Sequence, residues 1–468
     1  MQAGCSARAC SSSCPGGTHC RSRKAPPARR SARPRPCATK PARSAPPRSS
    51  LPGSRRSVKI TELTLGILTA VGGFVDVSEL VFMAQAGSRF QYALVWVIVV
   101  ATVGMMVFGE MSGRVAAIAK QPVFNMMRHR LGLNLGLVTL IASLISNTIT
   151  CAAEIGGVGI VLHLLTGFGL VPMAIAATFV FVATIWLLPF KWIERTYGLL
   201  GLFMVVFAVA LVAIEPPWGE IVKGLVPQVP AGLSTTELLT YGYFAVAIVS
   251  AVMFPYESYF YSSGAIEEKW SEKDLGLNRL TTTVGFGLGS LLGIAILASS
   301  AQLFGPQGIS PELPGTTALE AAIPFGRVGL LLALLGMLFA IAGAAIETCL
   351  SNAYSISQFF GWRWGRHLKP HQAPRFTFAW LAVFAIALAI VLTGIEPVAL
   401  AEYAVVASIL VLPLTYLPIL LLAGDRSYMR EHANGRIAKT LGWAYYALIV
   451  VAALGALPLY LLTEGGKL

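Results

Sequence analysis

Near-continuous apolar segments of about 20 residues follow one another from about residue 62 to the end of the chain. A helix of that length crosses the hydrocarbon core of a bilayer. The segments are not the ten-residue alternating stretches of an outer-membrane barrel, so the pattern predicts an all-α polytopic membrane protein. We predict about eleven spans, at residues 62–86, 91–111, 134–163, 169–189, 195–214, 236–263, 278–303, 327–357, 375–394, 398–423 and 440–462.

The polar connections between these spans test the count. If the N-terminus is cytoplasmic, the loops on that side carry seventeen Lys and Arg residues and the opposite loops carry four. An excess of positive charge in short loops marks the cytoplasmic side of a membrane protein. The pattern therefore predicts a cytoplasmic N-terminus, a C-terminus outside and, by default, a plasma-membrane location.

Composition agrees with this reading, because 55% of the residues are hydrophobic and only 12% are charged. The formal charge of +13 comes from the N-terminus alone. Residues 1–60 hold 14 of the 35 Lys and Arg residues and no Asp or Glu, and the rest of the chain has 21 basic and 22 acidic residues. We predict a disordered basic tail at 1–58 and a transmembrane transporter domain at 59–468.

Three explanations of the tail stay open: a contact with anionic lipid, a transit peptide, and a start codon assigned too far upstream. Five of the seven cysteines lie in the tail, but their spacing matches no zinc motif. The other two, Cys151 and Cys349, lie in apolar segments and are expected to pack there.

Eleven spans divide into five, five and one. Because five is an odd number, a second set of five spans would cross the membrane in the opposite orientation to the first. Inverted repeats are common in secondary transporters, which bind substrate at interrupted helices near the bilayer midplane. The first and sixth spans hold interruption signals at matching places. The first contains Gly72 and Gly73 just before "DVSE", and the sixth has Pro255 at its centre.

Acidic residues inside the predicted spans are the candidate chemistry. An unpaired charge in hydrocarbon costs several kcal/mol, and no Lys or Arg lies at similar depth. The carboxylates therefore carry a proton or meet a cation. Asp76, Glu79 and Glu257, with carbonyls freed at the two interruptions, make an all-oxygen site suited to hard divalent cations. Each acid has a plainer alternative, a neutral side chain hydrogen-bonded to a neighbouring helix. Glu154 and Glu347 are the acids for which a neutral, hydrogen-bonded side chain is the strongest alternative.

Motifs of soluble enzymes are absent from the sequence. It has no phosphate-binding Walker loop and no nucleophile–base set, and "GFGLGS" at 285–290 lies inside a span, where small residues pack helices. We expect no enzyme activity, no resident cofactor and no nucleic-acid partner. The expected partners are the lipid bilayer and the transported ion, and the sequence specifies no oligomeric state.

The residues resemble one known family, the Nramp divalent metal transporters, over about 62–460. In "DVSELVFMAQAGSRFQYALVWV", Asp76 falls on the aspartate of the family's first motif, followed in register by a "QAG" motif at 85–87. In "AVMFPYESYFYSSGA", Pro255 falls on the proline of the second motif. The resemblance implies a LeuT-like fold with 5+5 inverted repeats, discontinuous helices 1 and 6, and metal bound between those two helices. It also implies that Asp76 is a ligand and that Ala251 contributes its backbone carbonyl.

Departures from the family pattern change the expected ion. Glu79 replaces an asparagine, and Phe254, Tyr256 and Glu257 replace a methionine, a histidine and an asparagine. Loss of the thioether ligand and gain of two carboxylates favour a harder cation, a pattern similar to that of Nramp-related magnesium transporters. Only some of the residues that the Nramp family uses for proton transfer are present in this sequence. Glu154 matches one of them, and Glu347, which matches none, is a second candidate for a proton route.

These observations predict a secondary transporter that moves divalent cations of the Mn, Mg and Fe class by alternating access. Its metal site would contain Asp76, Glu79, Ala251 and Glu257. Two alternatives stay open at this point. One is an amino-acid or organic-cation permease of the same fold, and the other is a receptor that senses a cation without transporting it.

Overall fold

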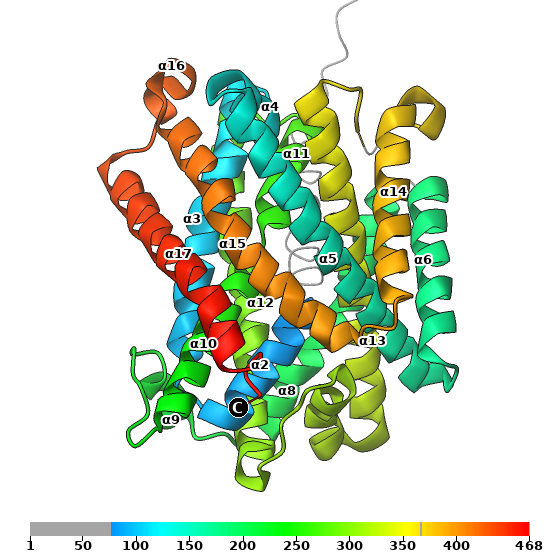
Figure 1. Ribbon diagram of the computed structural model, residues 1–468, viewed down its shortest axis with the longest axis vertical. Helices are drawn as coiled ribbons and strands as arrows, with labels where there is room; N and C mark the ends of the chain where they lie inside the picture. The colour runs from blue at the N-terminus through cyan, green and yellow to red at the C-terminus, as the bar shows by residue number, and fades with distance from the viewer. Residues whose placement is uncertain (1–75, 189, 366, 468) are drawn as a thin grey trace, which may run out of the picture. The chain divides into compact units, whose positions relative to one another are not determined.

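The computed structural model describes residues 76–188, 190–365 and 367–467, and all regular secondary structure in them is helical (Figure 1). The predicted tail and the first part of the first predicted span lie outside the described residues. The α-helices are α2 (Val77–Phe90), α3 (Val95–Ala119), α4 (Val123–Arg130), α5 (Leu133–Thr166), α6 (Leu170–Leu187), α7 (Phe190–Gly201), α8 (Val205–Ala213), α9 (Trp218–Lys223), α10 (Thr235–Val252), α11 (Pro255–Glu267), α12 (Leu275–Leu303), α13 (Pro314–Phe360), α14 (Pro374–Val391), α15 (Pro397–Gly424), α16 (Arg426–Met429) and α17 (Arg436–Leu462).

Ten helical stretches among the described residues are long and apolar enough to cross a membrane. They correspond to ten of the eleven predicted spans. The remaining predicted span, 62–86, is described only from Asp76 onward, and α2 follows directly after that residue. Two of the ten stretches contain two labelled helices each, because α7 continues through a short 3₁₀ turn into α8 and because α10 and α11 share one span.

Helix α13 is longer than the predicted span at 327–357. It begins at Pro314 and bends at Gly326, whose φ of 60° and ψ of −143° are not helical. Pro324 lies just before the bend. Proline interrupts the backbone ladder and glycine tolerates a positive φ, so the two residues end one helical segment and let another begin. The sequence pattern had not predicted the segment before this bend.

The centre of the bundle forms around α5, which packs against α13, α15 and α6. Helix α12 lies along α2, and α11 packs against α3 and α13. Helices α6 and α17 lie at opposite edges of this arrangement (Figure 1), and only a minority of their residues are buried. The short helices α2 and α11, which follow the two predicted interruptions, are therefore held among longer helices.

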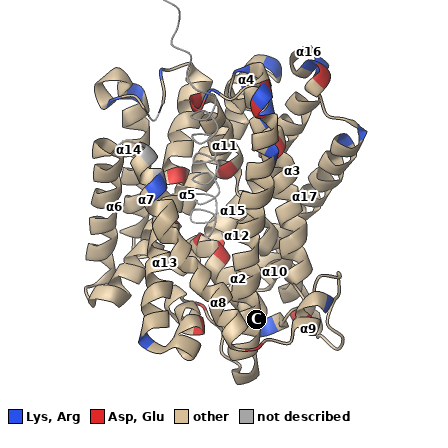
Figure 2. Ribbon diagram, turned by 180° about the vertical axis from the view of Figure 1, so that it is seen from behind, with Lys and Arg blue, Asp and Glu red and all other residues tan. Residues whose placement is uncertain are grey.

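Basic and acidic residues are distributed differently along the length of the bundle. Most Lys and Arg segments lie at the end that carries α4 and α16, whereas Asp and Glu segments also occur at mid-depth beside α2 and α11 (Figure 2). Arg130, on α4, forms an ion pair of 3.4 Å with Asp425, the cap of α16. A basic segment beside α7 lies at a depth similar to that of the acids near α11, whereas the acids beside α2 lie deeper than the basic end of the bundle (Figure 2).

Helix α2 packs on α12 with almost no space between the two backbones. A Cβ atom at Gly87 would lie 2.0 Å from the carbonyl oxygen of Leu297. The hydroxyl of Ser300, one turn further along α12, donates to the carbonyl of Ala84 at 2.5 Å. Glycine at position 87 therefore sets how closely these helices approach.

We predict that Gly87→Ala destabilises the protein by about 1–3 kcal/mol, because backbone atoms cannot move aside for the added methyl group. Thermal unfolding of the detergent-solubilised protein measures the effect. Gly264→Ala is the matched control, since a Cβ at that helical glycine meets nothing within 4 Å. Equal unfolding temperatures for the two variants would contradict this account of the contact.

Candidate functional site

The sixth predicted span is interrupted at its centre. Helix α10 ends at Val252 and α11 begins at Pro255, with Met253 and Phe254 between them outside either helix. Proline has no N–H and disfavours helical geometry in the residue before it, and Phe254 accordingly has φ −58° and ψ 138°. The sequence alone predicted this interruption at Pro255, and the structure confirms it.

The interruption frees backbone carbonyls inside the bundle. The residue four positions after Ala251 is Pro255, so the carbonyl of Ala251 has no helical N–H donor. The carbonyl of Met253 accepts a hydrogen bond of 3.1 Å from the buried hydroxyl of Tyr416 on α15. Tyr416 thus satisfies one carbonyl of the interruption, and the carbonyl of Ala251 is available to a cation.

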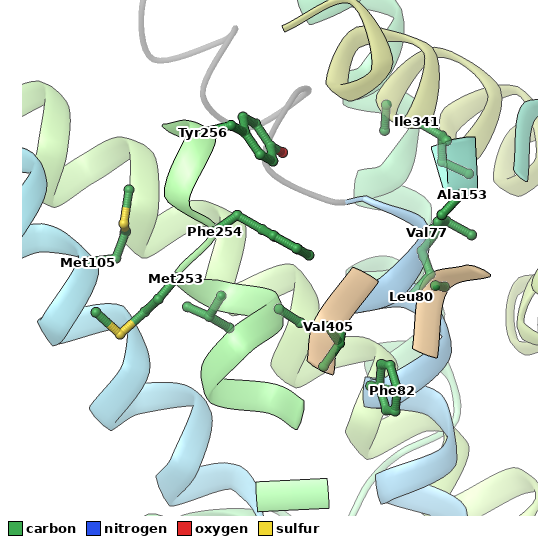
Figure 3. Close-up of a cluster of buried hydrophobic side chains, with 14 of the residues drawn as sticks. Val77, Leu80, Phe82, Met105, Ala153, Met253, Phe254, Tyr256, Ile341 and Val405 are labelled. Carbon is green, nitrogen blue, oxygen red and sulfur yellow. The ribbon is translucent and has the colours of Figure 1, made fainter. Parts of the chain in front are cut away.

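Adjacent side chains at the interruption point in opposite directions. Met253 extends toward α3, where its sulfur lies 3.1 Å from the position of a Cβ at Gly104. Phe254 extends the other way, toward α2 and Val77 (Figure 3). The side of the interruption that faces α2 therefore carries an aromatic ring, and the thioether of Met253 packs away from it.

Asp76 begins α2 as its N-cap. Its Oδ1 accepts the backbone N–H of Glu79 at 2.6 Å, which satisfies one of the free donors at the helix start. Its Oδ2 is buried and accepts no hydrogen bond from the described residues. One carboxylate oxygen therefore fixes the helix and the other is available to a ligand.

Glu79 lies in the first turn of α2 and is completely buried. Neither of its carboxylate oxygens has a hydrogen-bond partner among the described residues. Its Oε1 lies 3.3 Å from the position that a Cβ would take at Gly293 on α12. The absence of a side chain at Gly293 therefore leaves room for this carboxylate.

Glu257 occupies the first turn of α11, as Glu79 does in α2. It is partly exposed, but its Oε2 is buried and has no hydrogen-bond partner among the described residues. The N-terminal end of a helix carries a partial positive charge, which stabilises a nearby carboxylate. Both short helices thus direct their positive ends at acids that have no basic partner in the described part of the chain.

The three carboxylates influence one another electrostatically. Glu79 is repelled by Asp76 and by Glu257, and Asp76 also repels Glu257. Their oxygens do not, however, all lie within 4.8 Å of one another, so they do not form a closed cage in this structure. The arrangement is an open set of oxygen ligands around the interruption.

The two residues assigned to a proton route lie on facing helices. Glu154 on α5 is completely buried, and its Oε1 accepts a hydrogen bond of 3.1 Å from Thr348 on α13. Glu347 precedes Thr348 in the chain and is partly exposed. Glu154 interacts electrostatically with both Asp76 and Glu347. The pair thus lies on two helices that pack against each other, α5 and α13.

Sequence reasoning missed two acidic features. Glu320, in the first segment of α13, is completely buried, and both of its carboxylate oxygens lack hydrogen-bond partners among the described residues. It lies before the predicted span, although an acid within "TALEAAIPF" was a usable signal. Glu272, Glu431 and His432 meet at the surface, with His432 Nε2 3.1 Å from Glu272 Oε1. Exposed groups of this kind are common without an ion, so we do not place the transport site there.

Ten membrane-length helices, one of them interrupted beside buried acids, define the class: an integral multi-pass membrane protein with a LeuT-like transporter fold. The structure is similar to that of the Eremococcus coleocola manganese transporter in complex with an aromatic bis-isothiourea substituted compound. The TM-score is 0.67 at 18% identity, with 86% of this chain and 87% of that chain covered. It is also similar to MhsT in complex with L-phenylalanine, with a TM-score of 0.56 at 14% identity over 85% and 98% of the two chains.

Residues 66–458 match the model of the natural resistance-associated macrophage protein-like family, Nramp, and the chain belongs to this family. It is 28% identical to the divalent metal cation transporter MntH of Ralstonia nicotianae, over 83% of this chain and 88% of that protein. It is 26% identical to divalent metal cation transporter MntH 1 of Pseudomonas aeruginosa, over 83% and 89%. The family and the fold confirm the predicted resemblance and the transporter class, which is not a class of enzymes.

We predict that Gly293→Ala weakens Mn²⁺ binding about tenfold, because the added methyl group displaces the Glu79 carboxylate. Isothermal titration of the purified protein measures the affinity. Gly287→Ala is the matched control on the same helix, where a Cβ would lie 3.3 Å from the side chain of Met106 and touch no acid. An equal loss of affinity in both variants would contradict a specific role for the space at Gly293.

Proposed function

We propose that this chain is a secondary transporter of divalent metal cations that works by alternating access. One observation carries the proposal: carboxylates that have no basic partner among the described residues lie at the starts of both short helices, beside a carbonyl that has lost its helical donor. Asp76 and Glu79 supply the acids of α2, and Glu257 supplies the acid of α11. Membership of the Nramp family and the names of the MntH relatives support the same function.

In this proposal the site prefers hard cations. Its ligands are carboxylate oxygens and the carbonyl of Ala251, which suit Mg²⁺ and Mn²⁺ better than softer metals. Phe254 faces α2 at the position where the family pattern has a methionine, and Met253 packs toward α3. Position 254 thus supplies no thioether to favour a transition metal over Mg²⁺.

The open arrangement of the three acids supports alternating access. A divalent ion that binds all of them must draw them together, because its ligand oxygens lie about 2.0–2.6 Å from the metal. In our proposal, α2 and α11 move toward each other on the ion, and this motion closes one side of the site before the other opens.

The proposal includes a proton route through Glu154 and Glu347. Glu154 is buried beside Thr348 and interacts with Asp76, so a change of charge at Asp76 on ion binding reaches it directly. We further propose a plasma-membrane location with the end that carries α4 and α16 in the cytoplasm. The concentration of Lys and Arg at that end supports this orientation (Figure 2).

We predict that Asp76→Asn reduces Mn²⁺ uptake into proteoliposomes at least about tenfold, because a charged ligand is lost. The amide oxygen of asparagine still caps α2, so the fold is expected to persist. Asp425→Asn is the matched control, because Asp425 also caps a helix, α16, but lies at the surface. Uptake by Asp76→Asn equal to that of the control would contradict the assigned site.

In the wild-type protein we expect excess Mg²⁺ to compete with Mn²⁺ uptake, and we expect Phe254→Met to weaken that competition because it adds a thioether ligand. Uptake of radiolabelled Mn²⁺ over a series of Mg²⁺ concentrations measures both effects. Competition that is absent in the wild type, or unchanged in Phe254→Met, would contradict the proposed preference for hard cations. Uptake of amino acids instead of either metal would contradict the proposed function as a whole.

We predict that Glu154→Gln retains Mn²⁺ uptake but loses the acidification that accompanies it, because glutamine still accepts the hydrogen bond of Thr348 and cannot carry the proton. A pH-sensitive dye inside the liposomes reports the acidification while Mn²⁺ uptake is followed in parallel. Acidification by Glu154→Gln equal to that of the wild type would remove Glu154 from the proton route.

A further inference from the structure

The segment that follows α17 folds back on the bundle. Thr463, the C-cap of α17, is completely buried. Glu464, Gly465 and Gly466 follow with φ angles of 50°, 72° and 82°. The N–H groups of Gly466 and Lys467 both bond to the carbonyl of Thr463 at 2.9 Å. Three successive left-handed residues reverse the chain direction, and two of them are glycines because glycine adopts this geometry without strain.

This folded-back segment lies directly against α10 and α2. A Cβ at Gly466 would lie 3.0 Å from atoms of both Tyr243 and Phe244 on α10. The guanidinium of Arg89, near the end of α2, donates to the carbonyl of Gly466 and also lies over the ring of Phe244, 5.7 Å from its centroid. The backbone of the segment thus connects two helices that are far from α17 in sequence (Figure 1).

The same segment also reaches α15. Lys467 Nζ lies 3.7 Å from Oε1 of Glu402, whose side chain is only 8% exposed. A Cβ at Gly465 would lie 2.9 Å from the other oxygen of Glu402. A carboxylate buried to this extent is strongly destabilising without a cation, and the segment after α17 supplies one.

We propose that Thr463–Lys467 is a strap that holds α2 and α10 against α15 and α17, and that it is released when this end of the bundle opens. Helices α2 and α10 are the ones that lead into the candidate site, since α2 begins directly after Asp76 and α10 ends at Val252, at the interruption. Any opening between these helices and α15 must break either the contact of Arg89 with Gly466 or the contact of Lys467 with Glu402. The strap therefore adds to the free-energy difference between the closed and open states at this end.

Hydrogen–deuterium exchange of the full-length protein tests the strap without reference to the transported ion. If the exchange data contradict the strap, the proposed transport function is unaffected. If transport is not found, the proposal of the strap is likewise unaffected. The variants are Lys467→Gln, which removes the ion pair, and Gly466→Ala, which places a methyl group against two rings. Glu464→Gln is the matched control, because Glu464 belongs to the strap but is exposed.

In Lys467→Gln and Gly466→Ala, amides in peptides covering 84–93 and 235–245 are expected to exchange about tenfold faster, since weakened contacts raise the population of the locally open state. Peptides from α5 and α13 and the control variant are expected to exchange at wild-type rates. Unchanged exchange at 84–93 and 235–245 would overturn the proposal. An equal increase throughout the protein would also overturn it, because that result indicates general destabilisation.

A double variant tests the ion pair itself. Lys467→Gln leaves the Glu402 carboxylate buried without its cation, whereas Glu402→Gln combined with Lys467→Gln leaves a neutral pair. We expect exchange at 235–245 to be slower in the double variant than in Lys467→Gln alone. Exchange in the double variant that equals or exceeds that of the single variant would show that the charge of Glu402 does not hold the strap.

Discussion

The missing N–H of Pro255 is the constraint on which the rest of the site depends. In a membrane, an interrupted helix is tolerated only where its backbone groups are buried in protein and find other partners. Here α10 and α11 meet inside the bundle, and the hydroxyl of Tyr416 bonds to the carbonyl of Met253. The carbonyl of Ala251 loses its helical donor at the same point. The interruption thus places a free acceptor at the start of a new helix dipole, far from bulk water.

Carboxylates at the helix starts follow from this constraint. Asp76 and Glu79 occupy the start of α2, and Glu257 occupies the start of α11, where the helix dipoles offset part of the cost of burying an anion. The dipoles do not neutralise three acids that also repel one another. In the proposed function a divalent cation supplies the missing charge, and the absence of a side chain at Gly293 leaves the space that Glu79 needs. The proposed strap of residues 463–467 contacts α2 at its far end, through Arg89, and also contacts α10.

Much of this could be predicted from the sequence. The apolar segments indicated ten of the membrane helices, and Pro255 indicated the interruption, because both signals are local. The first segment of α13 was missed because it lies before the apolar segment at 327–357 and is separated from it by Gly326, which has a positive φ.

The contacts of Glu402 with Lys467 and of Glu79 with Gly293 were also missed. Each joins positions far apart in the chain, and only packing brings them together. For the same reason, the sequence indicated which acids were candidate ligands but did not indicate that their oxygens stand apart in this structure.

Anomalous X-ray diffraction from crystals of the protein soaked in Mn²⁺ tests the proposed metal site. We expect a single strong anomalous peak bounded by Asp76, Glu79, Glu257 and the carbonyl of Ala251, and loss of that peak in Asp76→Asn crystals. A peak at the surface group of Glu272, Glu431 and His432, with none beside the interruption, would contradict the proposed site.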